Sequence, residues 1–199
     1  HQKGQIRQIP ALCRKLIGGK SESVKTLRVM IMGIPNVGKS TIINILAGKV
    51  LAKVGDEPAV TRQQQRISLE NNIELYDSPG MLWPRMKNED IGYRLAVSGA
   101  IKNTALEFED VALYAGAFFL KAYPQAIMER YKIKTQPQTE AELLEIIARK
   151  RGGLRAGGVI DLHKASEILL HEYRTGKLGR LSLETPEMIK AAEVIEVID

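Results

Sequence analysis

The sequence predicts an α/β domain in residues 1–85 and an all-α domain in residues 86–199. Before Trp83-Pro84, apolar runs of strand length alternate with a helical pattern, whereas only helical patterns follow it. The chain has 199 residues, which is enough for one large domain or two small ones with cores of their own.

The α/β domain begins with a strand, a glycine-containing loop and a helix. The apolar run 27–32 predicts the strand, and residues 41–47 have one apolar face of helical period. Between them, residues 33–40 fit G-x-x-x-x-G-K-[ST], the pattern of a phosphate-binding P-loop. A glycine-punctuated turn with a chance lysine is the weaker explanation of a full match in this context.

The P-loop residue types match the chemistry of phosphate binding. Gly33 and Gly38 allow backbone torsions that turn successive amides inward, and the following helix favours a bound anion. Lys39 reaches the β and γ phosphates, and the Ser40 hydroxyl is placed to ligate Mg²⁺. The candidate nucleotide-binding residues of this stretch are Asn36, Val37, Gly38, Lys39, Ser40 and Thr41.

Two later segments complete the predicted site. Thr61 lies in a long loop over residues 48–66, where nucleotide switches place a threonine that holds Mg²⁺ and the γ-phosphate. Taken alone, it would more often be an ordinary loop residue. A β-hairpin over residues 66–76 leads into Asp77-Ser78-Pro79-Gly80, a D-x-x-G tetrapeptide that is common by itself.

Because this tetrapeptide follows the P-loop and the hairpin, we interpret it as the second half of a phosphate–metal site. Asp77 can hold Mg²⁺ through water, and the Gly80 amide can approach the γ-phosphate. The expected catalytic residues are therefore Lys39, Thr61 and Gly80, and the expected Mg²⁺ residues are Ser40, Thr61 and Asp77.

Helical patterns dominate the rest of the chain. A basic amphipathic helix is predicted over residues 4–17, with Pro10 either in its first turn or breaking it. A capping box at Thr139 marks one helix start independently of periodicity. The helices predicted after Trp83-Pro84 cover residues 89–102, 110–122, 124–131, 140–151, 162–175 and, as a terminal helix, 186–199.

A basic segment joins two of these helices and contains Arg149, Lys150, Arg151 and Arg155. Cations at a helix C-terminus followed by glycine are ordinary capping. The same side chains are candidates for contacting RNA phosphates. The two interpretations have about equal weight, and one does not exclude the other.

Composition sets broad limits on partners and compartment. Lys and Arg number 29 against 23 Asp and Glu, and this net charge of +6 is compatible with nucleic acid without requiring it. A single cysteine excludes an intrachain disulfide. No apolar run is long enough to cross a bilayer, so we expect a cytoplasmic protein with no membrane partner.

Several segments together resemble one known family. They read GIPNVGKST, VT at Thr61, DSPGMLWP, GYRLAVSGAIK and KRGGLRAGG, and they resemble the circularly permuted GTPases of the YlqF (RbgA) type over most of the chain. The resemblance implies a partial P-loop GTPase sheet, Rossmann-like, with flanking helices. It also implies GTP/GDP and Mg²⁺ as cofactors, and GTP hydrolysis coupled to assembly of the large ribosomal subunit and its rRNA. We expect a monomer.

Three features of the sequence qualify what the resemblance implies. The guanine-reading N-K-x-D motif, which precedes the P-loop in that family, is not in this sequence, and we interpret the chain as a fragment. Met81 stands where many GTPases place a water-orienting glutamine, which implies slow intrinsic turnover. Asn36 matches the P-loop asparagine of potassium-activated relatives, which implies K⁺ beside the phosphates.

The leading hypothesis is a GTP-dependent switch in assembly of the large ribosomal subunit. Whether this chain hydrolyses GTP by itself stays open, because guanine recognition depends on the resemblance. One alternative is a nucleotide-incompetent module that binds rRNA through its helical domain. Another is an unrelated P-loop ATPase.

Overall fold

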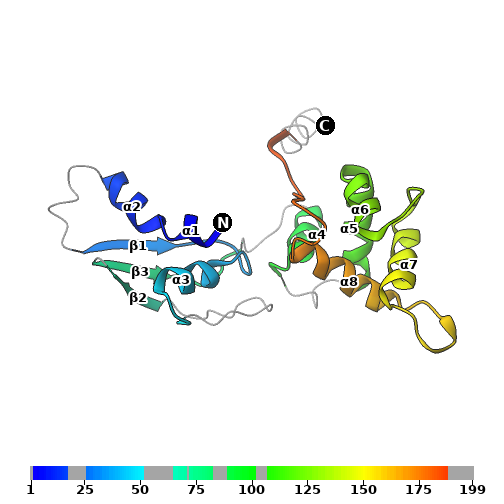
Figure 1. The fold of residues 1–199 in the computed structure, drawn as a ribbon, viewed down its shortest axis with the longest axis horizontal. Coiled ribbons are helices and arrows are strands. Elements are labelled where there is room, and N and C mark those ends of the chain that lie inside the picture. Colours follow the sequence, from blue (N-terminus) through cyan, green and yellow to red (C-terminus); the bar gives the residue numbers. More distant parts are fainter. Residues whose placement is uncertain are drawn as a thin grey trace. The chain divides into compact units, whose positions relative to one another are not determined.

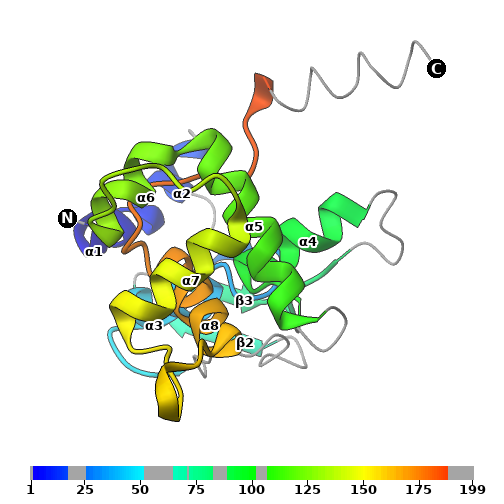
Figure 2. The same ribbon diagram turned by 90° about the vertical axis from the view of Figure 1, so that its right-hand side faces the viewer.

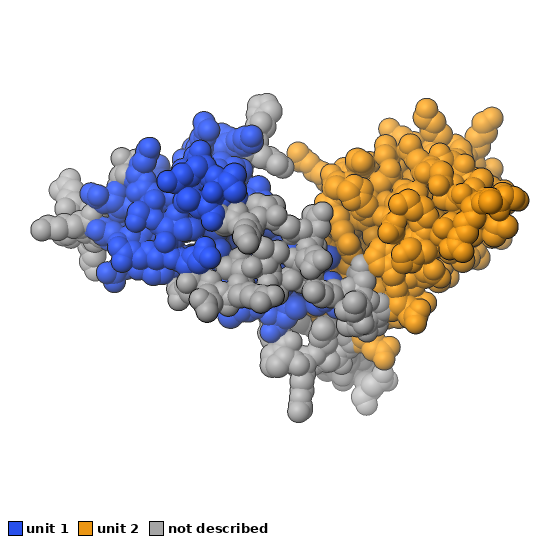
Figure 3. Space-filling model, turned by 90° about the horizontal axis from the view of Figure 1, so that it is seen from below, with its two compact units in different colours: residues 1–86, 99–102 blue, residues 87–98, 103–199 orange. Residues whose placement is uncertain are grey.

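The chain forms two compact units, which Figure 3 distinguishes by colour. The first comprises residues 1–86 and 99–102, and the second comprises residues 87–98 and 103–199. Within the described part, no helix has both the length and the apolar character to span a membrane. The structure, a computed structural model, describes residues 2–17, 26–51, 65–70, 72–82, 89–101 and 107–187.

The first unit contains a sheet with the strand order β1-β3-β2 among its described residues (Figure 1). β1 (Leu27–Ile31) pairs in parallel with β3 (Ile73–Asp77), and β3 pairs in antiparallel with β2 (Gln65–Leu69). The antiparallel pair confirms the predicted hairpin. The α/β class of this part of the chain is therefore confirmed.

One face of the sheet is covered by α3 (Lys39–Ala47) (Figure 1). Ile43 of this helix packs with Ile67 and Leu75 in a buried cluster. Because side chains alternate along a strand, Leu75 and Asp77 point to the same face. The opposite face is more open, and Met30 of β1 is 52% exposed there.

The N-terminal region forms two helices instead of one, and Pro10 has the first-turn position that was one of its two predicted alternatives. α1 (Gln2–Ile6) ends before a turn, and α2 (Ile9–Ile17) begins after it. Pro10 lies in the first turn of α2, where its missing amide hydrogen costs no helical hydrogen bond. The proline therefore marks a helix start inside the continuous amphipathic pattern.

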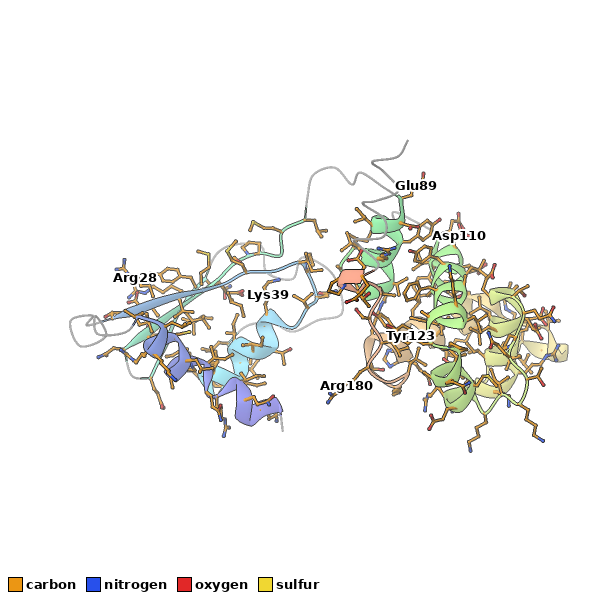
Figure 4. All side chains as sticks on the ribbon, turned by 90° about the horizontal axis from the view of Figure 1, so that it is seen from above. Arg28, Lys39, Glu89, Asp110, Tyr123 and Arg180 are labelled. Carbon is orange, nitrogen blue, oxygen red and sulfur yellow. The ribbon has the colours of Figure 1, made fainter. Side chains whose placement is uncertain are left out.

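The second unit is helical in its described residues, with α7 and α8 packed against each other and against α5 (Figure 2). Figure 4 labels Asp110 and Tyr123 near the two ends of α5. The core of the second unit includes the fully buried side chains of Phe119, Leu143 and Leu169. The helices are α4 (Glu89–Ser98), α5 (Phe108–Ala122), α6 (Pro124–Tyr131), α7 (Glu140–Arg151) and α8 (Leu162–Arg174).

The helix bounds predicted between residues 89 and 175 agree closely with these, with one informative exception, whereas most of the predicted terminal helix 186–199 lies outside the described residues. α6 and α7 have the predicted limits, and the Thr139 hydroxyl accepts a hydrogen bond from the Glu142 amide at 3.2 Å, as the capping box requires. α4, however, ends at Ser98 instead of Lys102. Gly99 stops it by adopting a left-handed φ of 80°, a conformation that favours glycine.

Candidate functional site

The P-loop lies between β1 and α3, as the motif requires. Asn36 and Gly38 both have left-handed backbones, with φ of 58° and 93°. Gly38 is the residue before α3, and a glycine has no side chain with which to cap the first amides of the helix. These amides and the helix dipole give the loop the character of an anion-binding site.

Lys39 is folded back over the loop that precedes it. Its ammonium donates hydrogen bonds to the carbonyl oxygens of Ile34 at 2.8 Å and Gly33 at 3.2 Å. The residue is only 8% exposed, and Figure 4 shows it where α3 begins. A phosphate oxygen bound in the loop would compete with these carbonyls for the same ammonium.

Burial and charge act in opposite directions on this lysine. Desolvation lowers the pKa of Lys39 from its usual value, and the negative charge of Asp77 partly offsets that effect. The net pKa is lowered. Asp77 is itself fully buried at the end of β3, so the two predicted site residues are electrostatically coupled.

The D-x-x-G segment leaves the sheet at the same edge as the P-loop. The parallel register places Asp77 opposite Ile31, the last residue of β1. The hydroxyl of Ser78 donates a hydrogen bond to the Ile31 carbonyl at 2.6 Å, and the Met81 amide donates to the Gly33 carbonyl at 3.3 Å. The two predicted phosphate-binding segments are therefore joined directly.

Gly80 has a packing role that the sequence did not reveal. A Cβ atom added to it would lie 2.7 Å from both the backbone nitrogen and the Cα of Pro35. Pro35 is buried, and its backbone cannot move aside as a flexible side chain would. Only glycine fits at this position in the observed arrangement.

The other predicted P-loop residues are distributed around this pair of segments. Val37 is 52% exposed, Ser40 is half-buried and Thr41 is exposed. The side-chain amide of Asn36 donates a hydrogen bond to the Gly99 carbonyl at 2.8 Å. Gly99 was not predicted as part of the site. The glycine inside an otherwise helical pattern was the available signal. Thr61 lies outside the described residues.

The residues present fit a magnesium ion in their chemistry. Ser40 offers a hydroxyl and Asp77 a carboxylate, which are hard oxygen ligands of the kind Mg²⁺ prefers. Magnesium sites in nucleotide enzymes use one or two such groups together with phosphate oxygens and water. The described residues contain no cluster of three or more His, Cys, Asp or Glu side chains suited to a metal.

The basic segment of the second unit begins in the last turn of α7. Lys150 donates to the Lys132 carbonyl at 2.9 Å, and Arg151 donates to the Arg130 carbonyl at 3.2 Å. Gly152 ends the helix with a φ of 81°, so the capping interpretation holds here. Arg149 is exposed in the same turn.

A short hairpin, residues 153–161, follows this helix end. Leu154 and Ile160 form an isolated antiparallel bridge, and the tip turns through a 3₁₀ segment, η3 (Ala156–Gly158). Arg155 forms an ion pair with Asp161 at 2.8 Å, and this contact lowers the pKa of Asp161 to about 2. The four predicted RNA-contacting cations are thus brought to one end of α7 and its hairpin.

Substitution of Gly80 tests the close packing of the two loops. Gly80→Ala should lower the free energy of unfolding by about 1–3 kcal/mol, because the added methyl overlaps the Pro35 backbone. Thermal or urea unfolding measures this difference. Gly4→Ala is the control, since nothing lies within 4 Å of the corresponding Cβ. Equal stability of the two variants would contradict the packing role.

The comparisons with known proteins agree with this geometry. A family model described as 50S ribosome-binding GTPase matches residues 28–145. The ribosome biogenesis GTPase A of Bacillus cereus is 45% identical over 194 residues, covering 94% of this chain and 66% of the relative. That of Priestia megaterium is 47% identical over 189 residues, covering 91% and 66%. This chain therefore spans about two thirds of the length of these relatives.

Solved structures give the same result. GDP-bound YlqF has a TM-score of 0.56 at 34% identity, covering 87% of this chain and 67% of the other. GNP-bound YlqF from T. maritima has a TM-score of 0.54 at 34% identity, covering 88% and 66%. The resemblance predicted from the motifs is confirmed, and the chain belongs to the 50S ribosome-binding GTPase family.

Proposed function

We propose that the chain binds and hydrolyses GTP as a switch in assembly of the large ribosomal subunit. The observation that carries the proposal is the direct joining of the P-loop and the D-x-x-G segment at one edge of the sheet, through the Met81–Gly33 hydrogen bond. The names of its relatives, ribosome biogenesis GTPase A, support the ribosomal part. We propose that the protein acts in the cytoplasm. We assign the partial P-loop GTPase domain to residues 1–85 and a helical domain to residues 86–199.

The site residues have separate roles in this proposal. The ammonium of Lys39 leaves the Gly33 and Ile34 carbonyls to neutralise the β and γ phosphates. Ser40 and Thr61 would hold Mg²⁺, Asp77 would hold it through its water shell, and the Gly80 amide would contact the γ-phosphate. The remaining cradle consists of the backbone amides of Asn36, Val37, Gly38 and Thr41. When bound, Mg²⁺ neutralises charge on the phosphate oxygens.

Nucleotide titration tests the assignment of the P-loop. We expect GDP to bind with preference over ADP, and Lys39→Met to weaken GDP binding about 10- to 150-fold, since hydrogen bonds to charged groups contribute about 1.5–3 kcal/mol. Fluorescence titration with labelled nucleotides measures both. Lys49→Met is the control, because Lys49 is exposed beyond the end of α3 in the same unit.

The other outcomes of this titration identify the alternatives. Preferred binding of ADP over GDP would indicate a P-loop ATPase. No binding by the wild-type chain would indicate an RNA-binding module without nucleotide chemistry.

Potassium is proposed as a further cofactor of the P-loop. The Asn36 side chain donates through its amide nitrogen to Gly99, which orients the group so that its oxygen is the atom suited to a hard cation. GTP hydrolysis should be roughly tenfold or more faster in K⁺ than in Na⁺, a part of what an arginine finger supplies. Asn36→Gly should abolish the difference. Equal rates in the two salts for the wild-type chain would contradict this proposal.

We propose that the basic end of α7 contacts rRNA. Arg149→Gln should weaken rRNA binding and reduce the salt dependence of log Kd by about one unit per lost phosphate contact, with no change in Tm. Filter binding over a salt series measures the slope. Lys121→Gln on α5 is the control, because the C-terminal end of α5 leads into α6, away from hairpin 153–161 (Figures 1 and 2). Equal effects of both variants would indicate nonspecific attraction alone.

A further inference from the structure

One short segment of the chain belongs to the first unit although its neighbours on both sides belong to the second. This segment, residues 99–101, is called the strap here. Residues 87–98 and 103–199 group with the helical unit, whereas the strap groups with the sheet and the P-loop, and Figure 3 colours it accordingly. Gly99 and Ala100 are buried, with Ala100 only 1% exposed. The strap is therefore packed and not a loose connection.

The strap is attached to the P-loop by a specific hydrogen bond. The Asn36 side-chain nitrogen donates to the Gly99 carbonyl at 2.8 Å across 63 residues of sequence. Asn36 itself has a φ of 58°, a left-handed backbone that asparagine and glycine tolerate better than most residues. The hydrogen bond to the strap therefore fixes the side chain of Asn36, and the conformation of the P-loop fixes its backbone.

The C-terminal end of α4, which precedes the strap in the chain, is hydrogen-bonded to α8. Arg174 of α8 donates to the carbonyls of Ala96 and Val97, in the last turn of α4, at 2.7 and 3.0 Å. Ala96 and Val97 are fully buried. These hydrogen bonds fix the last turn of α4 to α8 within the second unit.

α8 leads in turn to the basic segment. Asp161 caps the start of α8 by accepting a hydrogen bond from the Lys164 amide at 3.0 Å, and the same carboxylate pairs with Arg155 of hairpin 153–161. Within the second unit, hydrogen bonds therefore connect the end of α4 through Arg174 and α8 to Arg155 of hairpin 153–161.

We propose that the strap couples occupancy of the P-loop to the end of α4. A ligand that orders the loop shifts the position of residue 36, and the Asn36–Gly99 bond links that shift to the strap. By thermodynamic reciprocity, a partner that fixes the end of α4 changes the affinity of the P-loop for its ligand. The factor equals the one by which that ligand changes the affinity of the chain for the partner. The inference rests on the proposed function that the P-loop binds a nucleotide, and Asn36 acts in it as a positioning residue.

Hydrogen–deuterium exchange on the purified chain tests this coupling, with residues 95–101 and residues 33–41 monitored separately. Asn36→Gly removes the donor and keeps the left-handed backbone, and Asn36→Asp keeps the size but replaces the donor by an acceptor. Asn72→Gly is the matched control, because Asn72 also has a left-handed φ, 54°, in the hairpin turn of the same unit. Buffers contain Na⁺ only, so a lost K⁺ ligand cannot contribute.

Two results are expected. Without nucleotide, both Asn36 variants should exchange about 2- to 10-fold faster at the strap than the wild type and Asn72→Gly, as expected for the loss of one hydrogen bond. Saturating Mg²⁺-GDP should alter exchange at residues 95–101 in the wild type and in Asn72→Gly. This GDP-induced change in exchange should fall by about half or more in the Asn36 variants. Because GDP is saturating, a difference in affinity for GDP does not contribute.

The results that overturn the coupling differ from those that overturn nucleotide binding. Unchanged strap exchange in both Asn36 variants, or a full response at residues 95–101 while GDP protects residues 33–41, would overturn the coupling and leave the proposed function intact. If GDP fails to protect residues 33–41 in the wild-type chain, the proposed function is overturned, and the coupling with it.

Discussion

The parallel pairing of β1 with β3 is the constraint on which the candidate site depends. Its register places Asp77 opposite Ile31, so the P-loop and the D-x-x-G segment leave the sheet at the same edge. A slip of one residue would turn Asp77 to the opposite face, away from α3 and Lys39. The apolar positions that pack on Ile43, among them Leu75, specify that register. Hydrophobic patterning therefore determines where the charged groups of the site meet.

The carbonyl of Gly33 has a central position in the resulting arrangement. It accepts hydrogen bonds from both the Lys39 ammonium, at 3.2 Å, and the Met81 amide, at 3.3 Å. One bond belongs to the phosphate-binding lysine, and the other belongs to the segment that follows Asp77. The two donors share one acceptor. Movement of the Lys39 ammonium toward an anion therefore strengthens the hydrogen bond from the Met81 amide to the Gly33 carbonyl. The two segments of the site are therefore electrostatically dependent on each other as well as adjacent.

Much of this arrangement could be predicted from the sequence, because the decisive signals are local. A strand, a P-loop pattern and an apolar helix face define residues 27–47, and the hairpin brings Asp77 back beside them. The contacts of Gly80 with Pro35 and of Asn36 with Gly99 could not be predicted in this way. Each depends on the approach of two backbone segments that are distant in sequence, and neither periodicity nor residue type encodes such distances. Pro10 indicated a helix start or a break, but the amphipathic spacing that continues before it concealed the separate short helix α1.

The two glycines on either side of this site are required for different physical reasons. Gly38 has a φ of 93°, and nothing lies within 4 Å of a Cβ built on it, so a larger residue there would strain the backbone without a clash. Gly80 carries no such positive φ, but its Cβ position is occupied by the Pro35 backbone. Conformation therefore selects the first glycine and space selects the second. Since Pro35 belongs to the P-loop, the steric limit at Gly80 exists only while the two segments are together, and the glycine is a condition for their contact.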